Sequence, residues 1–241
     1  MINNTDKQNL FPKKIPKLTA EQKLIKDHFM EHWLKVLRKN YGIVDRFNHK
    51  VVVNNKPKNF LKTLEMGAGL GEHLNYEKLN DDQKKNYYAM DIRENLLKII
   101  SKEHPMVNTI LGDCEKKINF ENNFFDRVIA IHILEHLPNL PFAINEVSRV
   151  LKSSGLFQIV IPCEGSMAYT LARKISAKRI FEKKYKTSYD WYIKSEHVNL
   201  PHEIIIELKK KFAIIKETYF PIPISIKFCN LCIALDLKLK A

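Results

Sequence analysis

The sequence predicts an α/β protein in which helices cover both faces of a mostly parallel sheet. Short apolar runs alternate with helical stretches from residue 60 to residue 211, as strands joined by helical crossovers do. Three of the seven glycines fall within residues 67–71, directly after the first apolar run. The run 125–132 is apolar enough for a strand that is buried on both faces. These observations indicate a doubly wound fold with a ligand loop after its first strand.

The expected elements follow one another in chain order. The segment from Thr19 to Gln22 has the pattern of a capping box, so a helix is expected to begin there. Pro162 ends the fifth strand because proline cannot donate to a strand ladder. The expected strands are 61–65, 87–91, 107–111, 125–132, 156–161, 212–220 and 228–237. The expected helices are 19–41, 72–79, 94–102, 139–152 and 201–211.

A chain of 241 residues with 45% hydrophobic content suits a single domain with additions better than two full domains. The whole chain, residues 1–241, is therefore predicted to be one domain. Its expected parts are a leader and helical cap at 1–45, a core at 55–162, an insertion at 163–200, and a C-terminal helix and strand pair at 201–241. The helix of the cap is expected either to pack on the sheet or to cover the ligand cleft.

Net charge and cysteine content bear on the expected partners and cellular location of the protein. A net charge of +13 favours anionic partners, although much of it is lysine, which can equally form a solvated coat. The four cysteines are too few and too unevenly spaced for a disulfide framework, so a cytoplasmic location is expected. Cys229 and Cys232 are expected to be buried strand residues rather than a metal or redox pair. No signal peptide and no membrane span are predicted.

The spacing of the glycines separates two ligand families. Dinucleotide folds use G-x-G-x-x-G, in which the third glycine lets the helix pack closely beneath a pyrophosphate. Here the glycines are Gly67, Gly69 and Gly71, and Glu72 stands where that pattern needs its third small residue. A carboxylate at this position would face the diphosphate. A nicotinamide or flavin enzyme is therefore disfavoured.

The pattern Glu65-x-Gly67-x-Gly69-x-Gly71 resembles motif I of the class I S-adenosylmethionine-dependent methyltransferases. Later motifs of that family are resembled in the same order by Asp91, 112–114, 125–137 and 150–156, so the resemblance covers about residues 55–162. It implies a Rossmann-like sheet of seven strands in the order 3-2-1-4-5-7-6. It also implies S-adenosylmethionine as the methyl donor and S-adenosylhomocysteine as the product.

The resemblance also implies a set of cofactor contacts. An acid at Glu65 would stabilise the cationic methionine moiety, Asp91 would hold the two ribose hydroxyls, and Asp113 would accept from the adenine amino group. The complete set of implied cofactor-binding residues is Glu65, Gly67, Ala68, Gly69, Gly71, Asp91, Ile92, Asp113, Cys114 and His132.

Methyl transfer is an in-line displacement that depends mainly on positioning, and it needs a base only when the nucleophile starts protonated. His132 and His136 follow the fourth strand beside the expected methyl group, and His197 lies before the last helix. These three are the candidate catalytic residues, and the alternative for each is a role in loop orientation or packing. The basic insertion is expected to bind the acceptor, through Glu164, Arg173, Arg179, Tyr192 and His197, unless it is only a solvated helix face.

Two other interpretations are disfavoured. His132-x-x-Glu135-His136 matches a zinc-protease pattern, but that pattern requires a helix to bring both histidines to one face, and His132 ends a strand. No metal site is therefore expected. The turn after the fourth strand lacks the sequences of DNA-methylating enzymes, so DNA is not expected as a partner. An RNA methyltransferase and a non-catalytic, cofactor-binding regulatory module remain the alternatives to a small-molecule enzyme.

The turn 161–165 and the basic insertion are similar to methyltransferases of bacterial surface-polysaccharide biosynthesis. One such group forms O-methyl phosphoramidate modifications of capsules. This resemblance implies O-methylation of a small anionic acceptor that is phosphorylated or linked to a nucleotide. The oligomeric state does not follow from the sequence.

Overall fold

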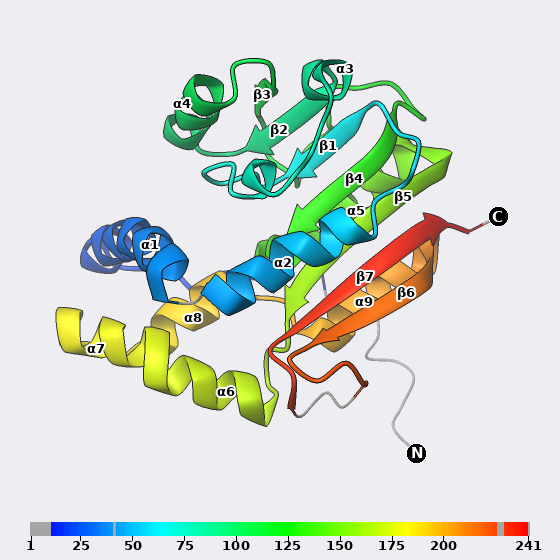
Figure 1. The fold of residues 1–241 in the computed structure, drawn as a ribbon. Helices are drawn as coiled ribbons and strands as arrows, with labels where there is room; N and C mark the ends of the chain where they lie inside the picture. Colours follow the sequence, from blue (N-terminus) through cyan, green and yellow to red (C-terminus); the bar gives the residue numbers. More distant parts are fainter. Residues whose placement is uncertain (1–10, 41, 226–228, 241) are drawn as a thin grey trace.

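The computed structural model describes residues 11–40, 42–225 and 229–240. A seven-stranded sheet in the order β3-β2-β1-β4-β5-β7-β6 forms its centre (Figure 1). β7 runs antiparallel to β5 and β6, and the other pairs are parallel. The predicted strand order and mostly parallel sheet are confirmed. The strands are β1 (Thr63–Met66), β2 (Tyr87–Asp91), β3 (Asn108–Leu111), β4 (Phe125–Ile131), β5 (Leu151–Pro162), β6 (Phe212–Phe220) and β7 (Cys232–Leu239).

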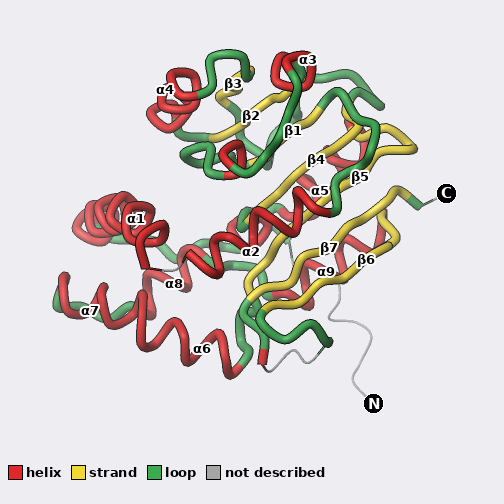
Figure 2. The backbone as a smooth tube through the Cα atoms, in the orientation of Figure 1, coloured by secondary structure: helices red, strands yellow, loops and turns green. Residues whose placement is uncertain are grey.

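Helices cover both faces of this sheet. The largest apolar cluster joins one face to α5 and α9, and another joins the opposite face to α2 (Figures 1 and 2). The α-helices are α1 (Ala20–Asn40), α2 (Gly42–Asn54), α3 (Asp81–Lys85), α4 (Glu94–Glu103), α5 (Leu140–Val150), α6 (Met167–Arg173), α7 (Arg179–Tyr185), α8 (Asp190–Glu196) and α9 (Pro201–Lys211). Two 3₁₀ turns, η1 (His73–Asn75) and η2 (Leu134–His136), and a π-helical turn, η3 (Lys174–Lys178), complete the described elements.

The two N-terminal helices, α1 and α2, pack on different parts of the protein. The sequence did not predict α2, which contacts β4, β5, β6 and β7 and buries Val51 and Val52 against the sheet. The described side chains of α1 pack instead on the insertion. Phe29 is 1% exposed, and its ring centroid lies 4.9 Å from that of Phe181 and 5.1 Å from that of Tyr192. α2 therefore covers the sheet, while α1 supports the insertion.

Several element boundaries differ from the prediction. A 3₁₀ turn and the short α3 replace the crossover helix expected from residue 72, because Asn80 and Gln83 form a capping box that begins a new helix. β5 begins at Leu151, before the turn that was expected at 153–155. The insertion holds α6, η3, α7 and α8 and is largely helical.

The predictions for the last strand and its cysteines were only partly right. β7 begins at Cys232, and the first residue of the strand predicted at 228–237 lies outside the described residues. Cys232 is buried in β7 as expected, whereas Cys229 is exposed, so the prediction that both are buried was wrong. Within the described ranges, no helix combines the length and the apolar character needed to cross a membrane.

Candidate active site

The strand order places the candidate site at the carboxyl ends of β1 and β4. The chain proceeds from β1 outward to β2 and β3 and then returns to β4 on the other side of β1. Ligands of open α/β sheets bind at such a topological switch point. The loops 67–71 and 132–136 follow these two strands. They touch, because a Cβ built on Gly67 would lie 2.6 Å from Cδ1 of Ile133.

The glycine loop adopts a backbone that few other residues tolerate. Gly67, Gly69 and Gly71 have φ angles of +66°, +57° and +75°, all in the left-handed region. The backbone N–H of Ala68 donates to the carbonyl of Met90 at 2.9 Å, which ties the loop to β2. The loop is therefore held in one conformation with its backbone close to the strand ends.

Replacing Gly67 by alanine is expected to lower the free energy of unfolding by about 1–2 kcal/mol, the usual cost of a left-handed residue with a Cβ. The added methyl group would also displace Ile133 and shift the loop. Chemical denaturation measures this change. Gly42→Ala is the matched control, because nothing lies within 4 Å of its added Cβ and its φ is not positive, so its stability should be unchanged or slightly higher. Equal stabilities of the two variants would contradict the prediction.

Asp91 connects the glycine loop to β2. Its side chain is only 4% exposed, and its Oδ2 accepts from the backbone N–H of Gly69 at 3.0 Å. Its Oδ1 accepts from the backbone N–H of Arg93 at 2.9 Å and from Nε of the same residue at 3.1 Å. This carboxylate is therefore held rigidly at the end of β2, where the sequence placed it.

The other predicted adenine-side residues lie nearby. Asp113 follows β3, and its Oδ1 accepts from the backbone N–H of Glu115 at 2.9 Å. Burial raises the pKa of the Cys114 thiol to about 12, and the carboxylates of Asp113 and Asp91 contribute to this rise. Ile92 is 66% exposed. An apolar side chain next to Asp91 is thus open to contact with a ligand.

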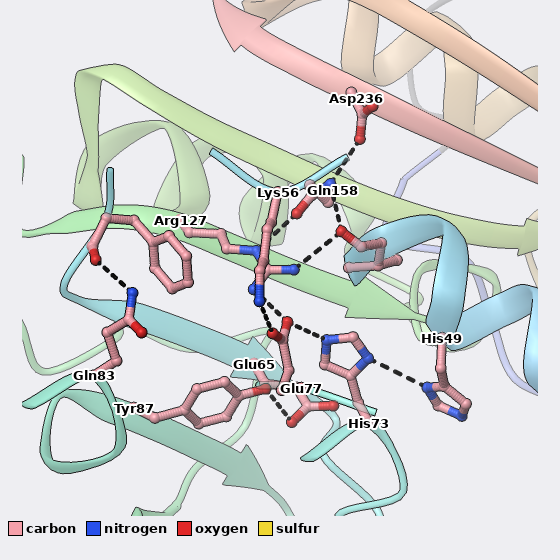
Figure 3. A network of polar contacts seen from close by, with 12 residues as sticks. His49, Lys56, Glu65, His73, Glu77, Gln83, Tyr87, Arg127, Gln158 and Asp236 are labelled. Atoms are coloured by element: carbon pink, nitrogen blue, oxygen red, sulfur yellow. Dashed lines mark hydrogen bonds and ion pairs between the residues drawn. The ribbon is translucent and has the colours of Figure 1, made fainter. Parts of the chain in front are cut away.

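Glu65 belongs to a buried polar network on the face that α2 covers (Figure 3). Its Oε2 accepts from the hydroxyl of Tyr87 at 2.8 Å. Burial raises the pKa of Glu65 to about 8, and the carboxylates of Glu72 and Glu77 act in the same direction. Glu65 is therefore mostly protonated at pH 7 in the structure as described.

Arg127 is the fully buried cation of the same network. Arg127 is fully buried in β4, and its Nη1 lies 2.5 Å from Oε1 of Glu77. Burial alone would raise the pKa of Glu77, but the hydrogen bond from His73 and the charge of Arg127 hold that pKa far below its usual range. Lys56 adds a contact of 2.8 Å to the same carboxylate. The buried carboxylate of Glu77 is thus ionised and paired.

The raised pKa of Glu65 predicts a pH dependence of stability. Between the unfolded pKa of 4.5 and the folded pKa of about 8, the folded protein keeps a proton that the unfolded chain releases, so this contribution to stability is lost as the pH rises. This effect should lower the free energy of unfolding of the wild type by on the order of 1 kcal/mol or more between pH 5 and pH 8. Glu65→Gln cannot ionise, so this decrease should be absent from the variant. Denaturation curves at both pH values test this. Parallel pH profiles of wild type and variant would contradict the prediction, and Glu94→Gln, on the exposed surface of α4, is the control.

Four residues after β4 and α8 form what we call the histidine cluster: His132, Glu135, His136 and His197. His132 has a φ of +51°, and its Nδ1 lies 3.2 Å from Oε1 of Glu135. Glu135 is 1% exposed. Burial alone would raise its pKa, but the hydrogen bond from His132 and the charges of the neighbouring histidines lower that pKa to about 2. The centre of the cluster is an ionised carboxylate.

Two histidines from distant parts of the chain meet in this cluster. The rings of His136 and His197 lie edge to face with their centroids 5.0 Å apart. Nδ1 of His136 lies 2.8 Å from the backbone oxygen of Glu196, and Nδ1 of His197 lies 2.9 Å from Oε2 of Glu164. Burial lowers the pKa of His136, which favours its neutral form. The structure thus brings the three predicted catalytic histidines to one place.

Some of the predicted acceptor residues join the cluster and others do not. Glu164 lies between His197 and Arg173 and forms hydrogen bonds with both. Its negative charge is therefore paired with the positive charge of Arg173. Tyr192 is 4% exposed and packs among the aromatic residues around Phe29. Arg179 is exposed on α7. The expected acceptor residues are therefore spread over the insertion.

Sequence reasoning overlooked two residues that build the cluster. Glu135 was noted only within the zinc-protease pattern and the motif at 125–137, without a role of its own, yet it lies at the centre of the cluster. Asn199 is fully buried, and its Nδ2 donates to the carbonyls of Leu134 and Leu137 at 2.8 and 2.7 Å. Asn199 thereby ties the segment after α8 to η2. The His-x-x-Glu-His spacing could have pointed to Glu135, whereas the contact of Asn199 depends on the fold.

The zinc-protease hypothesis does not fit the local structure. Residues 134–136 form a single 3₁₀ turn, and His132 lies at the end of β4. This segment is not the helix that the pattern requires. The histidine that comes close to His136 is His197, which lies outside the pattern.

Comparisons with known proteins agree with this geometry. Residues 64–159 match a family model described as a methyltransferase domain, and no curated protein matches the chain significantly in sequence. An S-adenosylmethionine-dependent methyltransferase from Thermotoga maritima aligns with a TM-score of 0.60 at 17% identity, over 88% of this chain and 99% of that one. A TehB-like one from Corynebacterium glutamicum aligns with a TM-score of 0.59 at 12% identity, over 90% and 100%.

The matched segment contains the parts on which the sequence prediction depended. It runs from β1 into β5 and includes the glycine loop, Asp91, Asp113 and the turn with His132 and Glu135. The solved structures add the seven-stranded fold. The chain therefore carries a methyltransferase domain at residues 64–159 on the class I fold, with S-adenosylmethionine as its cofactor.

Proposed function

We propose that this enzyme O-methylates a small acceptor whose hydroxyl group lies against the histidine cluster. The observation that carries the proposal is the convergence of His132, His136 and His197 beside the glycine loop, with Ile133 in contact with Gly67. We propose these three histidines as the catalytic residues.

The proposed cofactor contacts are those that the resemblance to the family implies. Asp91 would hold the ribose hydroxyls, with Gly69 and Arg93 fixing its orientation. Asp113 would meet the adenine. A cationic methionine moiety beside Glu65 would lower its pKa and release its proton. The other proposed contacts are Gly67, Ala68, Gly71, Ile92, Cys114 and His132.

The proposed chemistry is a direct displacement. A lone pair of the acceptor oxygen forms a bond to the methyl carbon, the sulfur–carbon bond breaks, and its electron pair remains on sulfur to give S-adenosylhomocysteine. The hydroxyl proton passes to an imidazole nitrogen. His136 and His197 both engage their Nδ1 atoms with oxygens, so Nε2 is the proposed acceptor of that proton.

We propose a phosphorylated or nucleotide-linked acceptor of the kind used in surface-glycan or O-methyl phosphoramidate formation in the cytoplasm. The exposed basic residues of the insertion support an anionic acceptor, although Arg173 already pairs with Glu164. They are Lys174, Arg179, Lys183, Lys184 and Lys186. Arg179 is the proposed contact among them. We also retain Tyr192 as a proposed substrate contact, which would require opening of the aromatic cluster around it.

A screen of acceptors with deuterated S-adenosylmethionine tests this function. We expect one labelled methyl group on a sugar phosphate, phosphoramidate or nucleotide-linked sugar, detected by mass spectrometry. His136→Ala should slow the transfer by about 100-fold or more if that imidazole is the base. His202→Ala, on the exposed surface of α9, is the control. Labelling of RNA instead, or cofactor binding without transfer to any acceptor, would contradict the proposal.

A further inference from the structure

We propose that Glu135, His136 and His197 form a binding site for a divalent first-row transition-metal ion such as Zn²⁺ or Mn²⁺. Each of the three residues offers one ligand atom, and these atoms all lie within 4.8 Å of one another. Two imidazoles and one carboxylate are a donor set that suits such ions. The sequence led us to expect no metal, because the pattern from His132 to His136 lacks the helix that it would need.

The hydrogen bonds of both histidines favour metal ligation. Nδ1 of His136 lies 2.8 Å from the backbone oxygen of Glu196, which can only accept. Nδ1 of His197 lies 2.9 Å from the carboxylate of Glu164. Each Nδ1 therefore carries the proton, and the lone pair of each ring is on Nε2. Metal-binding histidines are commonly oriented by this kind of bond from the opposite nitrogen.

Glu135 provides the second, independent observation. Its Oε1 is occupied by Nδ1 of His132 at 3.2 Å. Its Oε2 is buried and has no hydrogen-bond partner in the part of the chain that the structure describes. Leaving a buried carboxylate oxygen without a partner is costly. A cation bound to Oε2 would remove that cost, and Nε2 of His136 already lies 4.0 Å from Oε1 of the same carboxylate.

The backbone holds the three residues together before any ion binds. The backbone N–H groups of Val198 and Asn199 both donate to the carbonyl of Glu135, at 2.9 and 3.0 Å. The side chain of Asn199 adds two hydrogen bonds, to the carbonyls of Leu134 and Leu137. Metal bonds of about 2.0–2.2 Å require ligand atoms no more than about 4.4 Å apart. Side-chain rotations would close the remaining distance while the backbone stays in place.

An ion at this place would also define the acceptor more narrowly, a step that rests on the proposed function. With three protein ligands, the ion keeps open positions, and an oxygen bound there has a lowered pKa. The acceptor hydroxyl would then bind the ion through oxygen and lose its proton to water. In that case Nε2 of His136 and Nε2 of His197 hold the ion and do not act as the base. A hydroxyl next to a second oxygen donor, able to chelate the ion, is the chemical class that fits.

Titration with Co²⁺ tests the site. Protein stripped with a chelator should bind about one equivalent, seen as visible d–d absorption that Zn²⁺ competes away. Glu135→Gln and His197→Ala should each weaken binding by about 100-fold or more, and Glu164→Gln, which orients His197, by about 10-fold or more. His202→Ala should bind as the wild type does, since His202 is exposed on α9.

The same samples are titrated with S-adenosylmethionine to show that each variant is folded. Absence of saturable Co²⁺ binding in wild type that binds the cofactor would overturn the metal site and leave the methyltransferase function intact. Unchanged Co²⁺ affinity in Glu135→Gln or His197→Ala would overturn it too. If Co²⁺ affinity falls in these variants as expected but no acceptor is methylated, the result would support the metal site and contradict the proposed acceptor.

Discussion

Replacing Arg127 by methionine is expected to lower the free energy of unfolding by about 3–5 kcal/mol, a large part of the roughly 5–15 kcal/mol that stabilises a domain. Methionine fills much of the volume but leaves the buried carboxylate of Glu77 without its closest cation (Figure 3). Nε of Arg127 also donates to Gln158 at 2.7 Å, and Nη2 donates to the carbonyl of Val52 at 3.2 Å. Urea denaturation measures the loss.

Two further variants separate the buried charge from other effects. Arg127→Met combined with Glu77→Leu removes both charges, so it should recover part of the loss. Lys84→Met removes an exposed ion pair with Asp81 and should change stability by no more than about 0.5 kcal/mol. If Arg127→Met cost no more than Lys84→Met, the network around Glu77 would not be the buried electrostatic unit described here.

Asp91→Ala is expected to weaken binding of S-adenosylmethionine by at least about tenfold. A hydrogen bond to a charged group contributes about 1.5–3 kcal/mol, and Asp91 is proposed to make two with the ribose. The variant also releases the N–H of Gly69, so the loop loses part of its support. Calorimetry with the cofactor measures the change.

Asp82→Ala is the matched control for this variant. Asp82 is exposed in the first turn of α3, away from the glycine loop, so its loss should leave cofactor affinity unchanged. Thermal unfolding of both variants shows whether the fold survives. Wild-type affinity in a folded Asp91→Ala protein would mean that the ribose lies elsewhere.

Much of the fold could be predicted from the sequence because its signals are local. The strand 87–91 and the helix 201–211 were predicted with the bounds that the structure has, since apolar runs and turn residues delimit them. The resemblance to a known family supplied the strand order, which was confirmed. α2 was missed because its apolar face matches a sheet surface made by four distant strands. The helical spacing of Val44, Phe47 and Val51 could have indicated a helix, but not the surface on which it packs.

The candidate site was predictable where it follows the strand ends. Asp91 and the glycine loop come directly after β2 and β1, so their proximity follows from a parallel sheet. The histidine cluster was only partly predictable. His197 meets His136 because Asn199 ties two distant segments together, and the role of Glu135 depends on burial. Long-range contacts of this kind do not leave a spacing in the sequence.

Calorimetric titration with S-adenosylmethionine, repeated with S-adenosylhomocysteine, tests the central claim most directly. We expect saturable binding of about one equivalent of each, and loss of affinity in Asp91→Ala. If neither ligand bound to the folded wild-type chain at concentrations up to about 1 mM, which corresponds to about 4 kcal/mol of binding free energy, the assignment as a methyltransferase would be contradicted.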